Sequence, residues 1–177
     1  MVGTGGVVTA AVLAGAVAAG AGGLAAPADP DEIWRDSGLR VVDRAERSDT
    51  ECAPHSFGQV QQLLAATPCV ALDRALFTLT DDRGGTIVVS VAWVEFGDPD
   101  VAREFKRVED VHGTGDIAPL PGSLLLMPDV PFTAHHYDSD TLDGTTVVVA
   151  ETEAVEGGFT AEYLDDVAAI AVRTPRP

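Results

Sequence analysis

The sequence predicts an α+β fold, in which an antiparallel sheet of two hairpins, with about four to five strands, packs against about three helices. Three observations lead to this fold class. Strand-like apolar runs come in pairs joined by turn residues, helix-like runs with terminal signals separate those pairs, and a long uncharged segment stands apart at the N-terminus as a signal or anchor helix. The order along the chain is helix, hairpin, helix, hairpin, helix, which places neighbouring elements side by side.

The N-terminal segment, residues 1–28, is uncharged from Val2 onward and consists mainly of Ala, Gly and Val. An apolar core followed by small residues is typical of a signal peptide, and as a helix the segment is also long enough to span about 30 Å of hydrocarbon. It therefore predicts a cleaved signal peptide or a retained membrane anchor, although the usual Lys or Arg ahead of the apolar core is missing. A dinucleotide-binding loop at Gly3-Thr4-Gly5 is excluded because no strand precedes it. A buried helix fits poorly, because each interior glycine costs about 1 kcal/mol relative to alanine.

The rest of the chain has the size of one ordinary domain with its own core. We expect residues 29–51 to form a charged tether with one short helix and an edge strand, and residues 52–177 to form a single α+β domain. If the N-terminal segment directs export, this domain lies outside the cytoplasm, either secreted or anchored to the membrane by residues 1–28.

The formal net charge is −17, with 28 acidic and 11 basic side chains. This balance excludes nucleic acid as a partner, because phosphate backbones are bound through Lys and Arg. It is compatible with a small molecule or a protein as partner, and also with acidic residues that only keep an extracellular domain soluble. No cofactor is expected. The membrane is expected as a partner only through residues 1–28, if that segment is not cleaved.

Cys52 and Cys69 are the two cysteines, and an even pair in an exported chain predicts a disulfide. Between them we expect a helix, because Ser56 and Gln59 have the spacing of a capping box and Pro68 ends an apolar run with helical periodicity. The bridge would add about 3 kcal/mol by restricting the unfolded chain. The alternative is a pair of buried free thiols.

The strands are expected in two hairpins. Residues 74–80 and 86–96 lie on either side of a turn rich in Asp and Gly. The second of these strands is apolar on both faces, as is typical of a central strand. Residues 132–138 and 145–151 form the second pair, joined by an Asp-Gly turn.

Two more helices complete the predicted fold. Asp98 and Pro99 begin the first, whose apolar stripe runs to His112 before Gly113 ends it. The second covers residues 160–172. Its apolar face consists of Leu164, Val167, Ala168 and Ala171.

Residues 117–131 are apolar but interrupted by prolines and glycines, around the tetrad Leu124-Leu125-Leu126-Met127. Two interpretations remain open. The segment is either a buried loop that fills one end of the core, or an exposed apolar lip that contacts a ligand, a partner or the membrane surface.

The candidate binding residues are His112, His136, Tyr137 and Asp138. On a strand, His136 and Asp138 share one face, while His135 and Tyr137 share the other. A zinc site needs three or four convergent ligands, so these residues predict no metal site. The acidic stretch that begins at Asp138 also lacks the spacing of an EF-hand.

No residue is assigned a catalytic function, because the sequence has no nucleophile elbow and no other catalytic constellation. We therefore expect an acidic domain that binds a ligand or a protein without catalysis. Two alternatives remain open. One is a secreted hydrolase that gathers His112, His136 and Asp138 at one end of the sheet. The other is a structural or assembly subunit of the cell envelope, with a broad apolar surface around residues 124–127.

Overall fold

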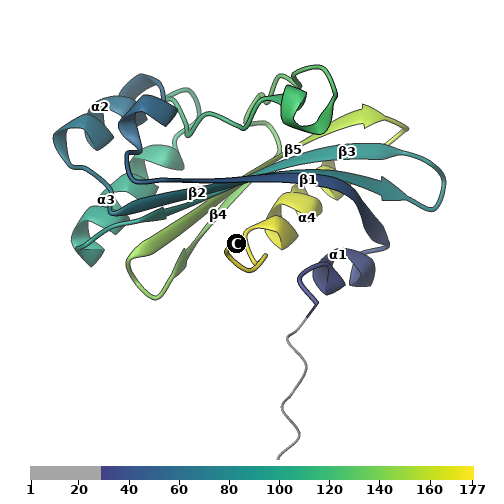
Figure 1. The fold of residues 1–177 in the computed structure, drawn as a ribbon, viewed down its shortest axis with the longest axis horizontal. Coiled ribbons are helices and arrows are strands. Elements are labelled where there is room, and N and C mark those ends of the chain that lie inside the picture. The colour runs from purple at the N-terminus through teal and green to yellow at the C-terminus, as the bar shows by residue number, and fades with distance from the viewer. Residues whose placement is uncertain (1–28) are drawn as a thin grey trace, which may run out of the picture.

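A computed structural model describes residues 29–177 (Figure 1). Its elements are α1 (Glu32–Asp36), β1 (Leu39–Asp49), the 3-10 segment η1 (Ala53–His55), α2 (Gly58–Ala66), β2 (Ala71–Asp81), β3 (Thr86–Glu95), α3 (Pro99–Glu109), the 3-10 segment η2 (Gly122–Leu125), β4 (Tyr137–Leu142), β5 (Thr146–Glu156) and α4 (Ala161–Ala171). The predicted α+β class is confirmed: the described residues form a five-stranded antiparallel sheet with four α-helices.

The signal peptide or anchor predicted for residues 1–28 lies outside the described residues. Within residues 29–177, none of the helices combines the length and the apolar character that a membrane crossing requires.

The strands follow the order β1-β2-β3-β5-β4, and every neighbouring pair is antiparallel. The strand predicted over residues 86–96 is the central strand β3. Asp143 and Gly144 form the turn between β4 and β5, both with positive φ, as the Asp-Gly pair predicted. The start of β4 was predicted wrongly. The strand begins at Tyr137 and not at residue 132, because Phe132 belongs to the loop that covers the sheet.

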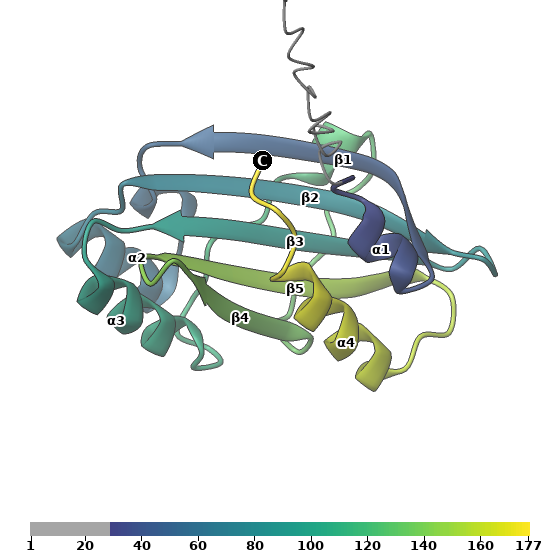
Figure 2. The ribbon, with the colours of Figure 1, turned by 90° about the horizontal axis from the view of Figure 1, so that it is seen from below.

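Different helices cover the two faces of the sheet, as Figures 1 and 2 show. The helices α1 and α4 pack on one face, which we call the α4 face, whereas α2, α3 and η2 lie over the other, which we call the α3 face. Successive residues alternate between the faces, so Phe77 and Val89 are buried on the α4 face while Leu76 and Val88 are buried on the α3 face. The central strand is therefore apolar on both sides.

The segment expected to be a tether belongs to the fold. Residues 29–51 supply α1 and the whole of β1, which pairs along its length with β2 as an edge strand. Trp34 and Leu39 are fully buried, and the ring of Trp34 lies 5.6 Å from that of Phe77. The short helix and the edge strand were predicted correctly. The buried apolar residues of this segment, Trp34 and Leu39, belong to the core on the α4 face.

The start of α3 agrees with the sequence, but its end was predicted wrongly: the helix ends at Glu109 and not at Gly113, so His112 lies outside it. The Asp98 carboxylate accepts a hydrogen bond from the backbone N–H of Asp100 (2.7 Å) at the start of α3, as predicted. Thr160 accepts from the N–H of Tyr163 (3.2 Å) and caps α4. The capping box predicted at Ser56 was wrong: Phe57 is the N-cap of α2, and the Ser56 hydroxyl donates to the carbonyl of Ala53 (3.0 Å) instead.

Candidate ligand-binding cavity

A cavity of about 530 Å³ lies between the α3 face and the segment 112–134, which we call the cavity loop. The sheet forms its floor and the loop forms its roof. The floor includes Leu76 of β2 and Val88 of β3. The apolar residues that the loop contributes are Leu120, Met127, Val130 and Phe132. The helices α2 and α3 cover only one end of this face (Figure 1), so the cavity loop covers the rest of it in place of a further helix.

The loop is folded back on itself over η2. The N–H of Gly122 donates to the Asp129 carboxylate (2.7 Å), and the N–H of Met127 donates to the carbonyl of Gly122 (3.1 Å). Leu125 is buried against the sheet, whereas Leu126 is 98% exposed. One part of the segment 117–131 therefore fills the core, as one interpretation expects, and its tip is exposed. Contact of this tip with a ligand, a partner or the membrane surface stays a prediction.

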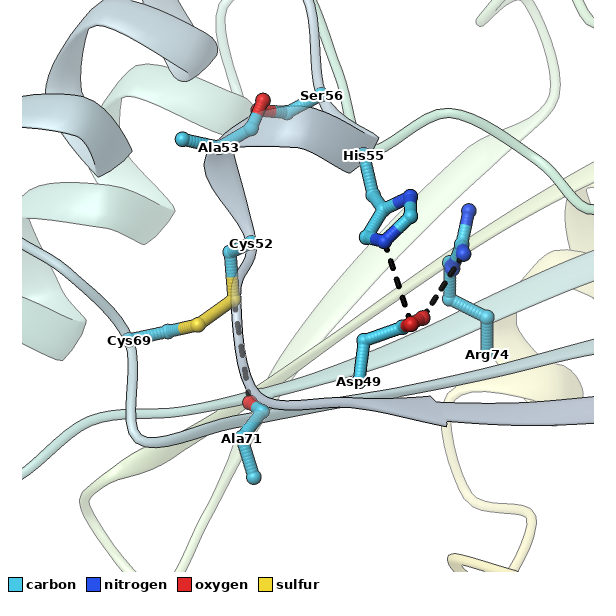
Figure 3. Close-up of a disulfide and its surroundings, with 8 residues drawn as sticks. All are labelled: Asp49, Cys52, Ala53, His55, Ser56, Cys69, Ala71 and Arg74. Atoms are coloured by element: carbon cyan, nitrogen blue, oxygen red, sulfur yellow. Dashed lines mark hydrogen bonds and ion pairs between the residues drawn. A yellow bond between two sulfur atoms is a disulfide. The ribbon is translucent and has the colours of Figure 1, made fainter.

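The predicted disulfide between Cys52 and Cys69 is present (Figure 3). It joins the two ends of the segment that contains η1 and α2. From this segment, the carbonyl of His55 accepts a hydrogen bond from the N–H of Ala118 (2.8 Å). Arg74 of β2 also donates to the carbonyl of Ala118 (3.0 Å) and pairs with Asp49 (3.0 Å). The beginning of the cavity loop is thus attached to the part of the fold that the disulfide holds together.

Two glycines allow the cavity loop to lie in direct contact with the start of α2. Gly58 and Gly115 both have positive φ, and their backbones cross in contact. A Cβ atom on Gly115 would lie 2.1 Å from the carbonyl oxygen of Phe57, and one on Gly58 would lie 2.4 Å from that of Thr114. No larger residue fits at either position, so the glycines permit the loop to approach α2.

Buried carboxyl groups lie where the loop, α3 and β5 meet. Glu109 is 5% exposed and Glu151 is 8% exposed. Asp116 and Glu151 line the large cavity, and Asp116 also lines a second cavity of about 220 Å³ together with Glu109. Among residues 29–177, neither side-chain oxygen of Glu109 has a hydrogen-bond partner. Ionised carboxyl groups beside it cannot supply one, because a carboxylate can only accept.

This environment favours the neutral acids. Burial, followed by hydrogen bonding to Asp116 and its charge, raises the pKa of Glu109 well above the usual range of a carboxyl group. Burial and the charge of Asp116 raise the pKa of Glu151 to about 8. A protonated Glu109 can donate to Asp116, which gives the buried oxygen a partner.

Nearby cations are already paired with other groups. Lys106 of α3 donates to the carboxylate of Asp110 (2.8 Å), which also accepts from the hydroxyl of Tyr137 (3.2 Å). Burial alone would raise the pKa of Asp110, but the hydrogen bonds from Lys106 and Ser139 lower it. The buried carboxyl groups around Asp116 are therefore not neutralised by this lysine.

The sequence-predicted site residues lie on both faces of the sheet. His112 lines the large cavity, with its ring 5.7 Å from that of His135, and Tyr137 packs on the same α3 face. His136 contacts Asp165 of α4, with 2.8 Å between Nδ1 and Oδ1. Asp138 accepts a hydrogen bond from the backbone N–H of Ser139 (2.8 Å). It lies two residues after His136 and so on the same face of the sheet as His136. The structure therefore brings His112 near Tyr137 but separates it from His136 and Asp138.

Sequence reasoning missed the acidic residues of this site. Glu109 follows Ala102 and Phe105 at helical spacing on the buried side of α3. Glu151 follows Val147 and Val149 at strand spacing on the α3 face. In both cases the position in the periodic pattern was the signal, since a charged residue in an apolar stripe marks either the end of the stripe or a buried carboxyl group.

Among residues 29–177, no group of three or more His, Cys, Asp or Glu side chains is arranged to hold a metal ion. No protein-family model, curated protein or solved structure matches this chain.

Proposed function

We propose that this protein is a non-catalytic binding protein that acts outside the cytoplasm and takes a small, largely apolar ligand into the cavity beneath residues 112–134. The observation that carries the proposal is the cavity itself. Its volume of about 530 Å³ falls in the range of small-molecule sites, roughly 300–1,000 Å³. Its wall also combines apolar side chains with a few polar groups, which is typical of such sites.

The position outside the cytoplasm is supported by two independent features. Residues 2–28 are apolar and uncharged, as in segments that direct export. The disulfide between Cys52 and Cys69 is the kind of bond that persists in oxidising compartments.

The non-catalytic part of the proposal is supported by the placement of the candidate acid–base residues. A hydrolase that used His112, His136 and Asp138 would need them within hydrogen-bonding reach of one substrate. His112 instead lies at the cavity on the α3 face, and His136 contacts α4 on the other side of the sheet.

A fluorescence titration of the full chain tests the proposal. The neutral, apolar fluorophore N-phenylnaphthylamine should bind and gain emission as it leaves water. Val130 lines the cavity and is half-buried, so Val130→Trp should fill the space and weaken binding by about tenfold or more. The matched control is Val42→Trp, at an exposed position of the edge strand β1 that does not line the cavity.

The control should bind the fluorophore as the wild type does. Wild-type binding together with an unchanged affinity of the Val130→Trp variant would place the fluorophore elsewhere and overturn the proposal. The same conclusion would follow if the wild-type chain bound no fluorophore.

A further inference from the structure

The cavity wall carries three carboxyl groups beside the polar residues His112 and Thr133. They belong to Asp116, Asp129 and Glu151, and among the described lining residues there is no Lys or Arg. Asp129 accepts a hydrogen bond from the N–H of Gly122, and one oxygen of Asp116 accepts from the N–H of Ile117 (2.6 Å). These bonds leave Glu151 and the other oxygen of Asp116 for a ligand. Two aromatic rings, Phe57 and Phe132, belong to the same wall.

Glu109 gives a second, independent indication. Its side chain is 5% exposed, and among residues 29–177 neither of its oxygens has a hydrogen-bond partner while the side chain is ionised. It lines the smaller cavity, which shares Asp116 with the larger one. A buried carboxyl group without a partner is costly, and it is more costly when it is charged. Such a group is retained at low cost only if a bound cation or a proton compensates it.

We propose that the ligand of this cavity is an organic cation, an amine or quaternary ammonium compound with an apolar body. This inference rests on the function proposed above and names the class of ligand. The ammonium group would lie against Asp116 and Glu151, and the apolar body would lie along Leu76, Val88 and the residues of the loop. Aromatic rings at the wall suit the same ligand, because a cation is attracted to the face of a ring.

An organic cation fits this wall better than a metal ion does. Divalent metals need several oxygen or nitrogen ligands that converge at about 2.0–2.6 Å. Within the described part of the chain, no three acidic, histidine or cysteine side chains are placed in this way. An ammonium group accepts a looser arrangement of carboxylates, and its apolar body uses the part of the wall that a metal would leave empty.

Binding of a cation should be coupled to loss of protons. The groups that face Glu109 and Glu151 are Asp116, His112 and His135 from the loop and its continuation, Asp110 after α3, Tyr137 from β4 and Glu153 from β5. Burial and then the neighbouring carboxylates, above all Asp116, raise the pKa of Glu151 to about 8. An ammonium group favours the charged form of Glu151, so the wild-type chain should release protons on binding and bind more tightly as pH rises.

Isothermal titration calorimetry of the full chain with three eight-carbon probes tests the inference. The probes are n-octylammonium, octanol and octanoate, which share one apolar body and differ in charge. At about pH 8, n-octylammonium should bind at least about tenfold more tightly than octanol, and octanoate more weakly than either. Titrations in two buffers of different ionisation enthalpy should show that n-octylammonium releases protons and octanol does not.

The variant Glu151→Gln should remove most of the advantage of n-octylammonium over octanol and leave octanol binding in place. Glu162→Gln is the matched control, since it removes the same charge from an exposed position of α4. Asp116→Asn provides a second variant with the same expected effect. Circular dichroism should show that each variant keeps its fold.

The outcomes separate the two proposals. If octanol binds as tightly as n-octylammonium, the cavity is a ligand site without preference for a cation, and this inference is overturned. If the control variant weakens n-octylammonium as much as Glu151→Gln does, the effect comes from the overall charge of −17, which also overturns it. If none of the probes binds, the proposed function itself fails.

Discussion

At the scale of single residues, the unusual feature is a pair of buried glutamates, one on the apolar face of a helix and one on the apolar face of a strand. Glu109 and Glu151 lie in positions where their neighbours along α3 and β5 are aliphatic or aromatic. Both are close to Asp116, and within the described part of the chain no Lys or Arg lines the cavities that they border. Selection for stability alone would favour apolar residues at these positions, since buried ionisable groups are commonly replaced without loss. Their presence therefore points to a function in binding.

The pH dependence of stability tests the state of Glu151. Its folded pKa of about 8 lies above the ordinary carboxyl value, so the folded chain keeps a proton that the unfolded chain has lost. The free energy of unfolding should therefore fall from about pH 5 to about pH 8, with a slope of up to about 1.4 kcal/mol per pH unit from this group. Glu151→Gln should flatten that decline in urea unfolding curves, whereas Glu162→Gln should leave the slope as it is. Parallel slopes in the wild type and Glu151→Gln would show that Glu151 is ionised throughout.

Residues on strands were predictable where a strict alternation fixed them. The separation of His136 from Tyr137 follows from the strand period of two, and the structure places the pair on opposite faces as predicted. The acidic cluster was not predictable in the same way, because Asp116 comes from an irregular loop. Its approach to Glu109 and Glu151 depends on tertiary packing, which leaves no local pattern in the sequence.

At the scale of elements, the integration of α1 and β1 has a direct test. Trp34→Ala should lower the free energy of unfolding by about 3–5 kcal/mol, because a large ring is removed from the core. Trp34→Phe should cost much less, since it keeps an aromatic ring beside Phe77 and removes an indole N–H that has no partner in the described structure. Urea unfolding measures both, with Val42→Ala as the exposed control on β1. Equal stability of the wild type and Trp34→Ala would mean that residues 29–51 are a tether after all.

The disulfide should affect both stability and the cavity. Replacing Cys52 and Cys69 with alanine should lower the free energy of unfolding by about 3 kcal/mol, since the unfolded chain gains freedom. The same variant should bind N-phenylnaphthylamine more weakly, because the segment that holds Ala118 loses its covalent support. A fluorophore affinity equal to that of the wild type would show that the cavity loop is held in place without the bridge. As a control, reductant should lower the stability and the fluorophore affinity of the wild type and leave both unchanged in the double variant.

Elements with local signals were predicted well, and elements fixed by contacts across the fold were not. The cap at Asp98, the Asp-Gly turn and the apolar face of α4 all depend on neighbouring residues, and all three agree with the structure. The capping box at Ser56 failed because Ser56 forms a β-bridge with Ile117 of the cavity loop, a contact far along the chain. The early start predicted for β4 failed for a related reason, since Phe132 belongs to the cavity loop and packs against the core beneath it.

At the scale of the whole molecule, the cavity results from unequal covering of the sheet. One continuous core joins α1 and α4 to the α4 face, and Figure 2 shows these two helices lying over the sheet. On the α3 face, two separate cores lie under the helices and under the cavity loop, and the space between the loop and the strands is not filled. A loop rich in proline and glycine can enclose such a space without packing tightly. A regular helix over the same strands would pack tightly against them and leave no space.

Methyl NMR spectroscopy of the full chain can show whether a ligand enters between the α3 face and the cavity loop, as we propose. Addition of N-phenylnaphthylamine should shift the methyl signals of Leu76, Val88 and Leu120 through the ring current of the fluorophore. The methyl signals of Leu79 and Val91, on the same strands but on the α4 face, should stay in place. Shifts confined to the α4 face, or no shifts at Leu76, Val88 and Leu120 at saturating fluorophore, would contradict the claim.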